Sequence, residues 1–411
     1  MTPTTLPEAE RLEPVAEALR RGGLALLTDR GRPDRGGIVV GAAARASDDV
    51  INFIATWARG ITAVAVPEDR AARIGLVRQA TDPRVRQEVR LDADRWAVTV
   101  EAREGVTTGI SASDRAATVR LVASPHVRGS DLTTPGHVHP VLADVRGLVA
   151  RQGWPEATCD ALRVSGLDPV GVYAQLLDDD GELLTGGALA AFATAHDLPT
   201  ASIEGLIGHR LAHETFVQQQ SQSTLPTRYG PFLARAFTNL LDDQQHLALS
   251  LGETRGAEPL LVRIHSECLT GDVFGSQRCD CGGQLDAALK RIAEAGRGAV
   301  IYLRQEGRGI GLLDKIRAYA LQDAGRDTVE ANLELGLPVD RRDFSIGAQI
   351  LHVLGARRVR LMTNNPDKVA ALERFGVSVI AREPLETEPN DANRDYLATK
   401  KTKLGHLLGG V

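Results

Sequence analysis

Residues 299–323 read AVIYLRQEGRGIGLLDKIRAYALQD and contain a complete strand–turn–helix unit. The apolar run Ala299–Leu303 predicts a buried strand, and the three glycines of EGRGIG predict a turn that lets backbone approach a ligand closely. A helix then continues to about Asp323. Because the N-terminus of a helix attracts anions, this stretch predicts an α/β unit with a phosphate-facing turn.

Polar residues in this unit also indicate what kind of ligand it binds. Arginine suits bidentate phosphate contacts, and the glutamate of the turn suits a guanine edge. Lys315 and Tyr319 are four residues apart, so they share one face of the helix, although Tyr319 alone is most simply a core aromatic residue. The inward apolar stripe of the helix is expected at Leu312, Leu313, Ile316 and Ala320.

Similar units recur along the chain. The remaining predicted strands are Gly23–Leu27, Ile38–Ala42, Val359–Met362 and Val377–Ile380. A further helix is predicted at Asp48–Arg59. With 411 residues, the chain is long enough for two or three domains. The stretch Phe216–Thr227 has no apolar periodicity and contains QQQSQS. We therefore predict an α/β (α+β) fold with two mixed domains, residues 1–215 and 228–411, joined by a polar linker at 216–227.

The composition of the chain excludes several classes of protein. Apolar residues make up 43% and charged residues 25% of the chain, which excludes a disordered protein. The formal charge of −5 argues against a general binder of nucleic acid or membrane surfaces. No uninterrupted apolar run reaches about 18 residues and the start lacks a leader pattern, so we expect a cytoplasmic protein with no membrane partner.

The cysteines form the strongest local motif. Three of the four lie at Cys268, Cys279 and Cys281, and thiolates are soft ligands that zinc favours. Three thiolates leave a fourth tetrahedral position open, as in a catalytic site. Spacing alone still allows a closed four-ligand site completed by His265 or Cys159, a zinc-ribbon interaction module, or buried free thiols.

A second helix N-terminus follows the strand Val359–Met362. Asn365 is suited to cap that helix with Pro366 at its first position, and the helix should close at Phe375-Gly376. Thr363 and Lys368 would then bracket a phosphate site.

Charged side chains elsewhere are ambiguous. Asp340 and Arg342 fall on one side if that segment is extended, although a solvated charge run is the simpler alternative. Only six residues are Lys, which draws attention to Lys315 and Lys368. The others are expected to be solvated: Lys290 on a helix, and Lys400, Lys401 and Lys403 in a tail.

Residues 225–408 closely resemble GTP cyclohydrolase II. The resemblance rests on RIHSECLTGD at 263–272, Cys279-Asp280-Cys281, RQEGR at 304–308, KIRAYALQD at 315–323, TVEAN at 328–332 and TNNP at 363–366. It implies hydrolysis of GTP to 2,5-diamino-6-(5-phosphoribosylamino)pyrimidin-4(3H)-one, formate and diphosphate.

The same resemblance implies roles for individual residues. Zinc is held by Cys268, Cys279 and Cys281, and its water attacks C8 of guanine. Tyr319 orients water, Asp340 accepts a proton, and Arg342 acts on the α-phosphorus as a nucleophile or, more ordinarily, as a phosphate clamp. GTP, accompanied by Mg²⁺ on its triphosphate, is bound by Arg263, Ile264, His265, Ser266, Glu267, Gln284, Glu306, Gly307, Arg308, Thr328, Thr363 and Lys368. The family further implies a homodimer.

Residues 14–210 resemble 3,4-dihydroxy-2-butanone 4-phosphate synthase. The resemblance rests on INF at 51–53, VTTGISASDR at 106–115, PGHV at 135–138 and RQG at 151–153. That family enolises a sugar phosphate with a divalent metal.

This chain departs from the synthase pattern at the metal ligands. The family's acidic loop appears here as RPDRGG at 32–37, so the metal glutamate is Pro33 and the later aspartate is Gly37. The metal histidine is Trp154, and an active-site glutamate is Gln175. Asp114, Arg115 and His137 remain. We therefore expect a domain that is inactive as a synthase and serves as a scaffold, dimerisation surface or regulator.

Two alternatives remain open for the second half. One is a paralogue that stops at a formamide product or serves a specialised pathway. The other is a GTP-binding regulator without catalysis.

Overall fold

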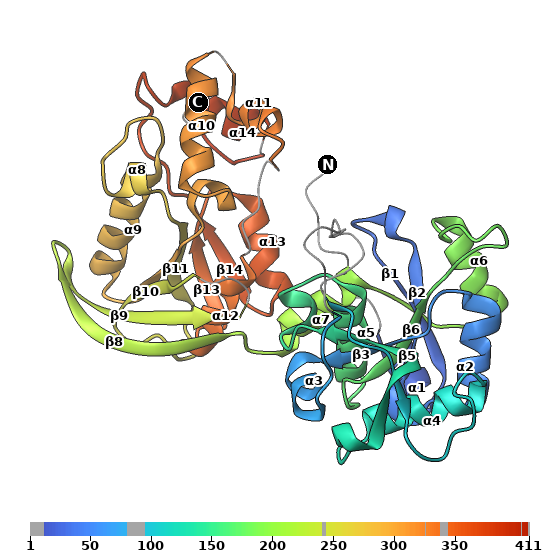
Figure 1. The fold of residues 1–411 in the computed structure, drawn as a ribbon. Coiled ribbons are helices and arrows are strands. Elements are labelled where there is room, and N and C mark those ends of the chain that lie inside the picture. Colours follow the sequence, from blue (N-terminus) through green and yellow to red (C-terminus); the bar gives the residue numbers. More distant parts are fainter. Residues whose placement is uncertain are drawn as a thin grey trace. The chain divides into compact units, whose positions relative to one another are not determined.

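The computed structural model describes residues 12–79, 95–240, 244–324, 326–337, 344–403 and 405–409. The chain divides into two compact units between Arg210 and Leu211, and in the described residues each contains a seven-stranded mixed sheet with helices (Figure 1). The predicted fold class, two mixed α/β domains, is confirmed. Among the residues described, no helix is long and apolar enough to span a membrane.

The N-terminal unit has its sheet in the order β4-β5-β3-β6-β2-β1-β7. Its strands are β1 (Leu24–Thr28), β2 (Gly37–Ala42), β3 (Ala63–Pro67), β4 (Val100–Ala102), β5 (Leu132–Ala143), β6 (Gly171–Gln175) and β7 (Thr200–Ser202). Its helices are α1 (Glu13–Arg20), α2 (Asp48–Phe53), α3 (Glu68–Ile74), α4 (Ala112–Ala123), α5 (Trp154–Val164), α6 (Gly187–Ala195) and α7 (Ile203–His213), the last crossing the division. A short 3-10 turn, η1 (Pro33–Arg35), precedes β2.

Both faces of this sheet are buried. Successive residues of β2 alternate between two apolar clusters: Val39 packs with Ile51 of α2 and Val119 of α4, while Ile38 packs with Leu162 of α5. A strand buried on both faces is apolar at every position, as the GIVVGA run of β2 is.

The C-terminal unit orders its sheet as β14-β13-β11-β12-β10-β9-β8. Its strands are β8 (Val217–Thr227), β9 (Gly230–Asn239), β10 (His246–Leu251), β11 (Leu260–Ser266), β12 (Gly298–Leu303), β13 (Arg358–Met362) and β14 (Ser378–Glu383). Its helices are α8 (Leu269–Asp272), α9 (Cys281–Ala295), α10 (Leu312–Asp323), α11 (Thr328–Glu334), α12 (Ser345–Val353), α13 (Pro366–Arg374) and α14 (Arg394–Thr402). The 3-10 turn η8 (Glu306–Gly309) separates β12 from α10.

Four neighbouring strands of this sheet are parallel and determine where the site lies. Strands β14, β13, β11 and β12 pair in parallel, whereas β10, β9 and β8 extend the sheet antiparallel. Ligands of open α/β sheets bind beyond the carboxyl ends of parallel strands. At that edge β11 leads to Cys268, β12 leads to Glu306 and β13 leads to Thr363.

Every strand predicted from an apolar run is present, within one residue at each end except for β14, which continues to Glu383 instead of ending at Ile380. The predicted helix Asp48–Arg59 begins as α2 and continues as a π-helical turn to Ala58. The cap of α13 is also as predicted, since the Asn365 side chain accepts a hydrogen bond from the backbone of Asp367.

The segment expected to be a linker is different. Residues 217–227 form β8, which pairs along its length with β9 as an edge strand. Its side chains from Gln218 to Pro226 are exposed, so the strand is held mainly by backbone pairing with β9 and needs no apolar alternation. The lack of apolar periodicity in this segment is therefore a property of an exposed edge strand and not of a linker.

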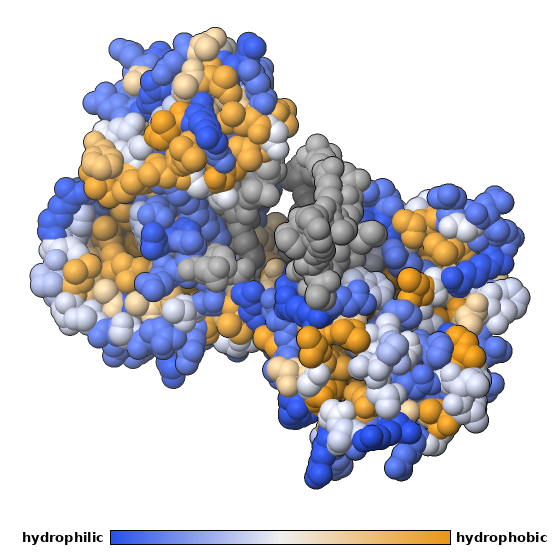
Figure 2. All heavy atoms as spheres, in the orientation of Figure 1, coloured by the Kyte–Doolittle hydropathy of each residue, from blue (hydrophilic) through white to orange (hydrophobic). Residues whose placement is uncertain are grey.

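Helix α10 also presents the opposite face from the one predicted. Leu313 is 67% exposed, and Leu312, Ile316 and Ala320 are exposed as well, whereas Lys315 and Ala318 are buried. Hydrophobic residues accordingly gather on the surface over the region of α10 in Figure 2. The helix turns its polar face inward because that face lines the site described next.

Candidate active site and metal centre

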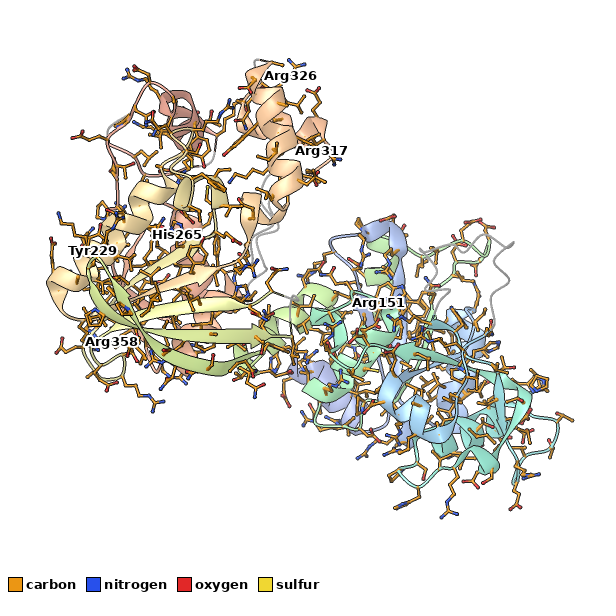
Figure 3. All side chains as sticks on the ribbon, turned by 60° about the vertical axis from the view of Figure 1, so that its left-hand side comes forward. Arg151, Tyr229, His265, Arg317, Arg326 and Arg358 are labelled. Atoms are coloured by element: carbon orange, nitrogen blue, oxygen red, sulfur yellow. The ribbon has the colours of Figure 1, made fainter. Side chains whose placement is uncertain are left out.

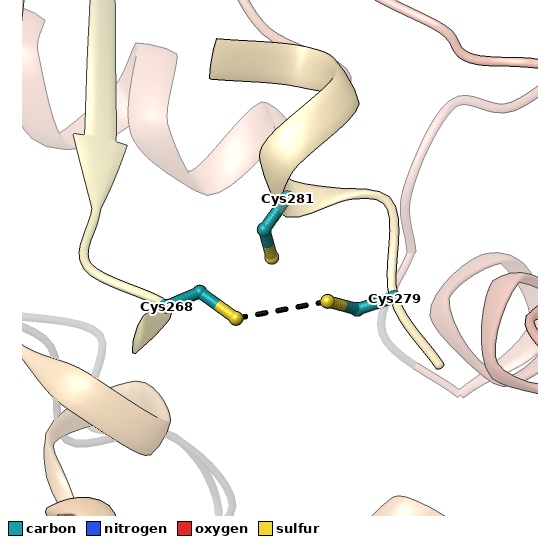
Figure 4. Close-up of side chains that lie close together, drawn as sticks. All are labelled: Cys268, Cys279 and Cys281. Atoms are coloured by element: carbon teal, nitrogen blue, oxygen red, sulfur yellow. Dashed lines mark hydrogen bonds between the residues drawn. The ribbon is translucent and has the colours of Figure 1, made fainter. Parts of the chain in front are cut away.

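Three cysteine sulfurs meet at the edge of the parallel strands. Cys268 follows β11, while Cys279 and Cys281 stand at the start of α9 (Figure 4). The three Sγ atoms lie within 4.8 Å of one another, and those of Cys268 and Cys279 are 3.6 Å apart. Tetrahedral zinc with Zn–S bonds of about 2.3 Å needs sulfurs about 3.8 Å apart, so this cluster fits the ion.

Gly271 backs the cluster at close range. A Cβ at this position would lie 2.9 Å from Sγ of Cys279 and 3.2 Å from Sγ of Cys268. The sulfurs therefore converge in a space that only glycine leaves open.

Neither residue considered as a fourth ligand joins the cluster. Cys159 is a fully buried thiol in the N-terminal unit, where burial raises its pKa well above the usual range. His265 directs Nε2 to both oxygens of Asp272, at 3.1 Å each. In the part of the chain that the structure describes, the cluster has three protein ligands, which favours an open site over a closed structural one.

Lys315 ties the cluster to the glycine-rich turn. Its Nζ donates to Sγ of Cys268 at 3.1 Å and to Oε1 of Glu306 at 2.7 Å. Burial opposes the charge of Lys315, but the hydrogen bond to Glu306 and the charge of Cys268 outweigh it and raise the pKa of Lys315. Hydrogen bonds from Cys279 and Cys281, aided by Lys315, lower the pKa of Cys268 far below that of a free thiol. A permanent ammonium therefore lies against a thiolate.

Glu306 is held on both carboxylate oxygens. Oε1 also accepts from the backbone of Gly307 at 2.8 Å, and Oε2 accepts from the backbone of Leu269 at 2.6 Å. A carboxylate offers about four acceptor positions, so little of Glu306 remains for a guanine edge. These contacts link Glu306 to the turn, Lys315 and the cysteine loop.

Asp272 organises the loop beneath the sulfurs. It accepts from Tyr302 Oη at 2.8 Å and from the backbone of Cys268 at 3.0 Å, and it faces His265. The rings of His265 and Tyr302 stack with centroids 5.5 Å apart. Burial lowers the pKa of His265, although Asp272 opposes the shift, so the imidazole is neutral at pH 7. Figure 3 labels His265 at the heart of this unit.

Tyr319 reaches the cluster from α10. Its Oη lies 3.4 Å from Oγ1 of Thr270, which is itself 3.6 Å from Sγ of Cys268. Burial raises the pKa of Tyr319 to about 12, so the phenol keeps its proton. The predicted shared face of Lys315 and Tyr319 is confirmed, and it faces the cysteines.

A polar chain runs along the other wall. Arg263 donates to the backbone oxygen of Met362 at 2.9 Å and to Oε1 of Gln284 at 2.5 Å. The amide nitrogen of Gln284 donates to Oδ2 of Asp280 at 2.6 Å. Lys400 donates to the other oxygen of Asp280.

One pocket gathers most of the residues predicted to bind nucleotide. It is lined by Arg263, His265, Ser266, Glu267, Gln284, Glu306, Gly307, Tyr319 and the three cysteines. Three predicted contacts do not line it: Ile264 is buried in β11, Thr363 bonds its own loop, and Lys368 donates to the Ile264 backbone oxygen at 2.9 Å.

Four predicted residues cannot be placed. Asp340 and Arg342, together with the side chains of Arg308 and Thr328, lie outside the described residues.

The pocket also contains residues that sequence reasoning missed. These are Arg278, Ile310, Ala318, Gln322, Asn332, Tyr396, Lys400 and His406. The prediction that Lys400 is solvated is wrong, since it is 7% exposed and paired with Asp280. Lys403 pairs at the surface with Asp327 and Glu330, and Lys290 is exposed as predicted. The one available signal was the four-residue spacing of Tyr396 and Lys400, which puts both on one face of α14.

In the N-terminal unit, the segments around Pro33 and Trp154, where the sequence analysis expects altered synthase ligands, lie together. Arg32 and Arg35 both donate to the backbone oxygen of Gln152, at 2.7 and 2.9 Å. Both also pair with the buried carboxylate of Asp29. The guanidinium of Arg35 lies 4.9 Å from the ring centroid of Trp154. Two cations therefore occupy the space between residues 29–35 and 152–154.

Other acidic groups here are already engaged. Glu156 is fully buried, accepting from Arg151, which Figure 3 labels, and from the backbone of Asp144. Asp114 caps its own loop through Thr107 and Gly109.

The retained Arg115 and His137 each have a partner as well. Arg115 reaches Oγ1 of Thr62 at 3.4 Å, and His137 reaches Glu101 at 3.0 Å.

Comparison with known proteins agrees with this two-part architecture. Residues 13–209 match the family described as 3,4-dihydroxy-2-butanone 4-phosphate synthase, and residues 218–384 match GTP cyclohydrolase II. The chain is 45% identical over 399 residues to riboflavin biosynthesis protein RibBA of Bacillus cytotoxicus, covering 97% of this chain and 99% of the relative. RibBA of Bacillus cereus is 43% identical over the same length.

Among solved structures, the chain is similar to RibBX of A. baumannii, a two-domain 3,4-dihydroxy-2-butanone 4-phosphate synthase. The TM-score is 0.65 at 26% identity, with 92% of this chain and 100% of the other covered. The full-length identity to RibBA, the two matched domains and the cysteine cluster together show that the chain belongs to the RibBA family of riboflavin biosynthesis proteins, with a synthase-type domain followed by a GTP cyclohydrolase II domain.

Proposed function

We propose that the C-terminal domain is a zinc-dependent GTP cyclohydrolase II that releases formate and diphosphate from GTP. The observation that carries this proposal is one pocket in which three cysteine sulfurs face Tyr319, Arg263 and Gln284. The RibBA relatives and the matched family support the substrate class.

The residues of the pocket would have different roles in this reaction. Cys268, Cys279 and Cys281 would hold zinc, which when bound supplies a Lewis acid and brings the pKa of a coordinated water towards neutrality. Three thiolates donate much charge to the metal, and the ammonium of Lys315 offsets part of it at Cys268. The protonated phenol of Tyr319 can donate a hydrogen bond beside the cluster.

The remaining nucleotide contacts are proposed from the family resemblance. Arg263, His265, Ser266, Glu267, Gln284, Glu306 and Gly307 line the pocket, which supports their assignment. For Ile264, Arg308, Thr328, Thr363 and Lys368 the assignment rests on the resemblance alone. So do the roles of Asp340 as proton acceptor and Arg342 as nucleophile or phosphate clamp, Mg²⁺ on the triphosphate, and a homodimer.

Product analysis tests this function. Purified zinc-loaded protein should convert GTP to formate, diphosphate and the fully deformylated pyrimidine, identified by mass. A formamide product without formate would establish the paralogue that stops early. Intact GTP would establish the regulator.

We further propose that the N-terminal domain is inactive as a synthase. Its support is the environment of Arg35, whose guanidinium stacks on Trp154 and pairs with Asp29 where the family resemblance expects a metal. At Gly37, where the family has aspartate, a Cβ would lie 2.8 Å from Cδ2 of Leu189 and 3.1 Å from the backbone oxygen of Leu27. A side chain at position 37 would therefore require Leu189 to shift, and this position offers no carboxylate.

Ribulose 5-phosphate with Mg²⁺ tests this second proposal. We expect no butanone phosphate above background, while the same preparation releases formate from GTP. Turnover of the sugar phosphate would show that another residue set holds the metal and would overturn the inactivity.

A further inference from the structure

The C-terminal helix α14 lies beyond the residues that match the cyclohydrolase family, which end at 384, yet it contributes to the pocket. Tyr396 and Lys400 of α14 line the pocket, together with His406 just after it. The segment is tied down behind the helix, since Leu407 donates to the backbone oxygen of Asn364 at 2.8 Å and Gly409 donates to Glu386 at 3.0 Å.

Lys400 is an unusual residue to find there. It is 7% exposed, and a buried lysine requires a partner because desolvation penalises its charge. The partner is Asp280, whose side chain is 2% exposed and lies 2.5 Å from Nζ. Nζ also lies 4.6 Å from the ring centroid of Tyr396, a cation–π contact.

Asp280 in turn fixes a side chain of the nucleotide site. Because a carboxylate only accepts hydrogen bonds, the Gln284 nitrogen must face Asp280 and its oxygen must face the donor Arg263. The orientation of the Gln284 amide is thereby set at both ends. Without Lys400, Asp280 would be an uncompensated buried carboxylate and would draw in water or shift.

We propose that Lys400 is a positioning residue of the nucleotide site, which orients Gln284 through Asp280 and makes α14 part of substrate binding. This rests on the proposed GTP site. Asp280 also stands between the ligands Cys279 and Cys281, so the competing role for Lys400 is to hold the metal loop alone. Zinc content separates the two roles.

The test compares Lys400→Met with Lys401→Met, its exposed neighbour on the same helix. Both are purified with zinc, and zinc stoichiometry, KM and kcat for GTP are measured. Binding is measured separately with 7-deaza-GTP, whose five-membered ring lacks the amidine and cannot be opened at C8. For Lys400→Met we expect full zinc, a KM and an analogue Kd raised on the order of tenfold, and a smaller change in kcat. Lys400→Arg should recover part of the loss.

Removing both charges keeps the test decisive if the single variant folds poorly. In Lys400→Met/Asp280→Asn the amide can still accept from Gln284, so the double variant should bind the analogue no worse than Lys400→Met, a non-additive result. An analogue Kd for Lys400→Met within twofold of Lys401→Met overturns the inference. So does zinc loss with an unchanged KM for the zinc-loaded fraction. If wild-type protein binds the analogue but leaves GTP intact, the proposed activity fails while the binding comparison still decides this inference.

Discussion

The ammonium of Lys315 lies 3.1 Å from Sγ of Cys268 and 2.7 Å from Oε1 of Glu306, so one buried cation joins the metal-binding cysteines to the glycine-rich turn. A lysine on the inward face of α10 is costly unless its charge is used. In the proposed zinc site it would offset the thiolate charge that otherwise reduces the acidity of the metal.

Replacing Lys315 should therefore impair turnover more than metal binding. For Lys315→Met we expect zinc to remain bound and kcat for GTP to fall by about 10²-fold, the usual cost of losing one electrostatic group in an active site. In the cobalt-substituted protein, the sulfur-to-metal charge-transfer band should move to lower energy, because the thiolate loses its cationic donor. Arg317→Met is the matched control, since Arg317 points outward on the same helix (Figure 3) and pairs only with Asp314 among described contacts. Normal kcat with an unmoved band would contradict this account.

Gly271→Ala should disturb the metal site without touching a ligand. The added Cβ would press on Sγ of Cys279 and Cys268, and the sulfurs would have to separate. We expect zinc affinity, measured by competition with a chelator, to fall about 10- to 100-fold. Gly208→Ala serves as the control, because nothing lies within 4 Å of a Cβ there. If Gly271→Ala binds zinc with the affinity of the wild-type protein, the side chain at position 271 does not press on the cysteine sulfurs.

Arg35 should stabilise the N-terminal unit. Arg35→Ala loses the stacking on Trp154 and removes one partner of the buried Asp29, which should lower the free energy of unfolding by about 2 kcal/mol. The three tryptophans all lie in this unit, so their fluorescence reports its unfolding in urea. Arg20→Ala, which breaks a surface pair with Glu13, should change stability by less than about 0.5 kcal/mol. If the two variants lower the free energy of unfolding equally, Arg35 does not have this stabilising role.

The stability of the C-terminal unit should fall in mild acid. Burial lowers the pKa of His265 below its usual 6.5, so the unfolded chain binds this proton more readily than the fold does. Stability is therefore complete above pH 6.5 and declines as the pH falls from 6.5 through the lower, folded value. His352, whose pKa burial also lowers, acts in the same direction. Hydrogen exchange of β11 amides between pH 5 and 8 should show this decline, with a shallower slope in His265→Gln. Parallel slopes would refute the contribution of His265.

The sequence predicted the fold where local signals and burial agree. The apolar runs predicted at β12 and β13 become strands because both lie in the interior of the sheet, and Asn365-Pro366 caps a helix through chemistry confined to a few residues. The cysteines could be assigned to one site because three of the four crowd into residues 268–281 and thiolates are ligands that zinc favours.

Long-range contacts explain what the sequence could not predict. Edge strand β8 needs only a backbone partner, so its polar sequence resembled a linker. Leu313 faces outward because α10 turns Lys315 towards Cys268, a residue 47 positions away. Lys400 and Lys401 are neighbours in sequence, and the ion pair with Asp280, 120 positions away, lies with the former.

The measurement that tests the central claim most directly is formate release from GTP before and after metal removal. Zinc-loaded protein should release one formate for each GTP consumed. Treatment with a chelator should abolish release, and added Zn²⁺ should restore it in proportion to metal bound up to one ion per chain. Formate release that persists in protein shown to contain no zinc would contradict the account, because the three cysteines would then not form the catalytic centre.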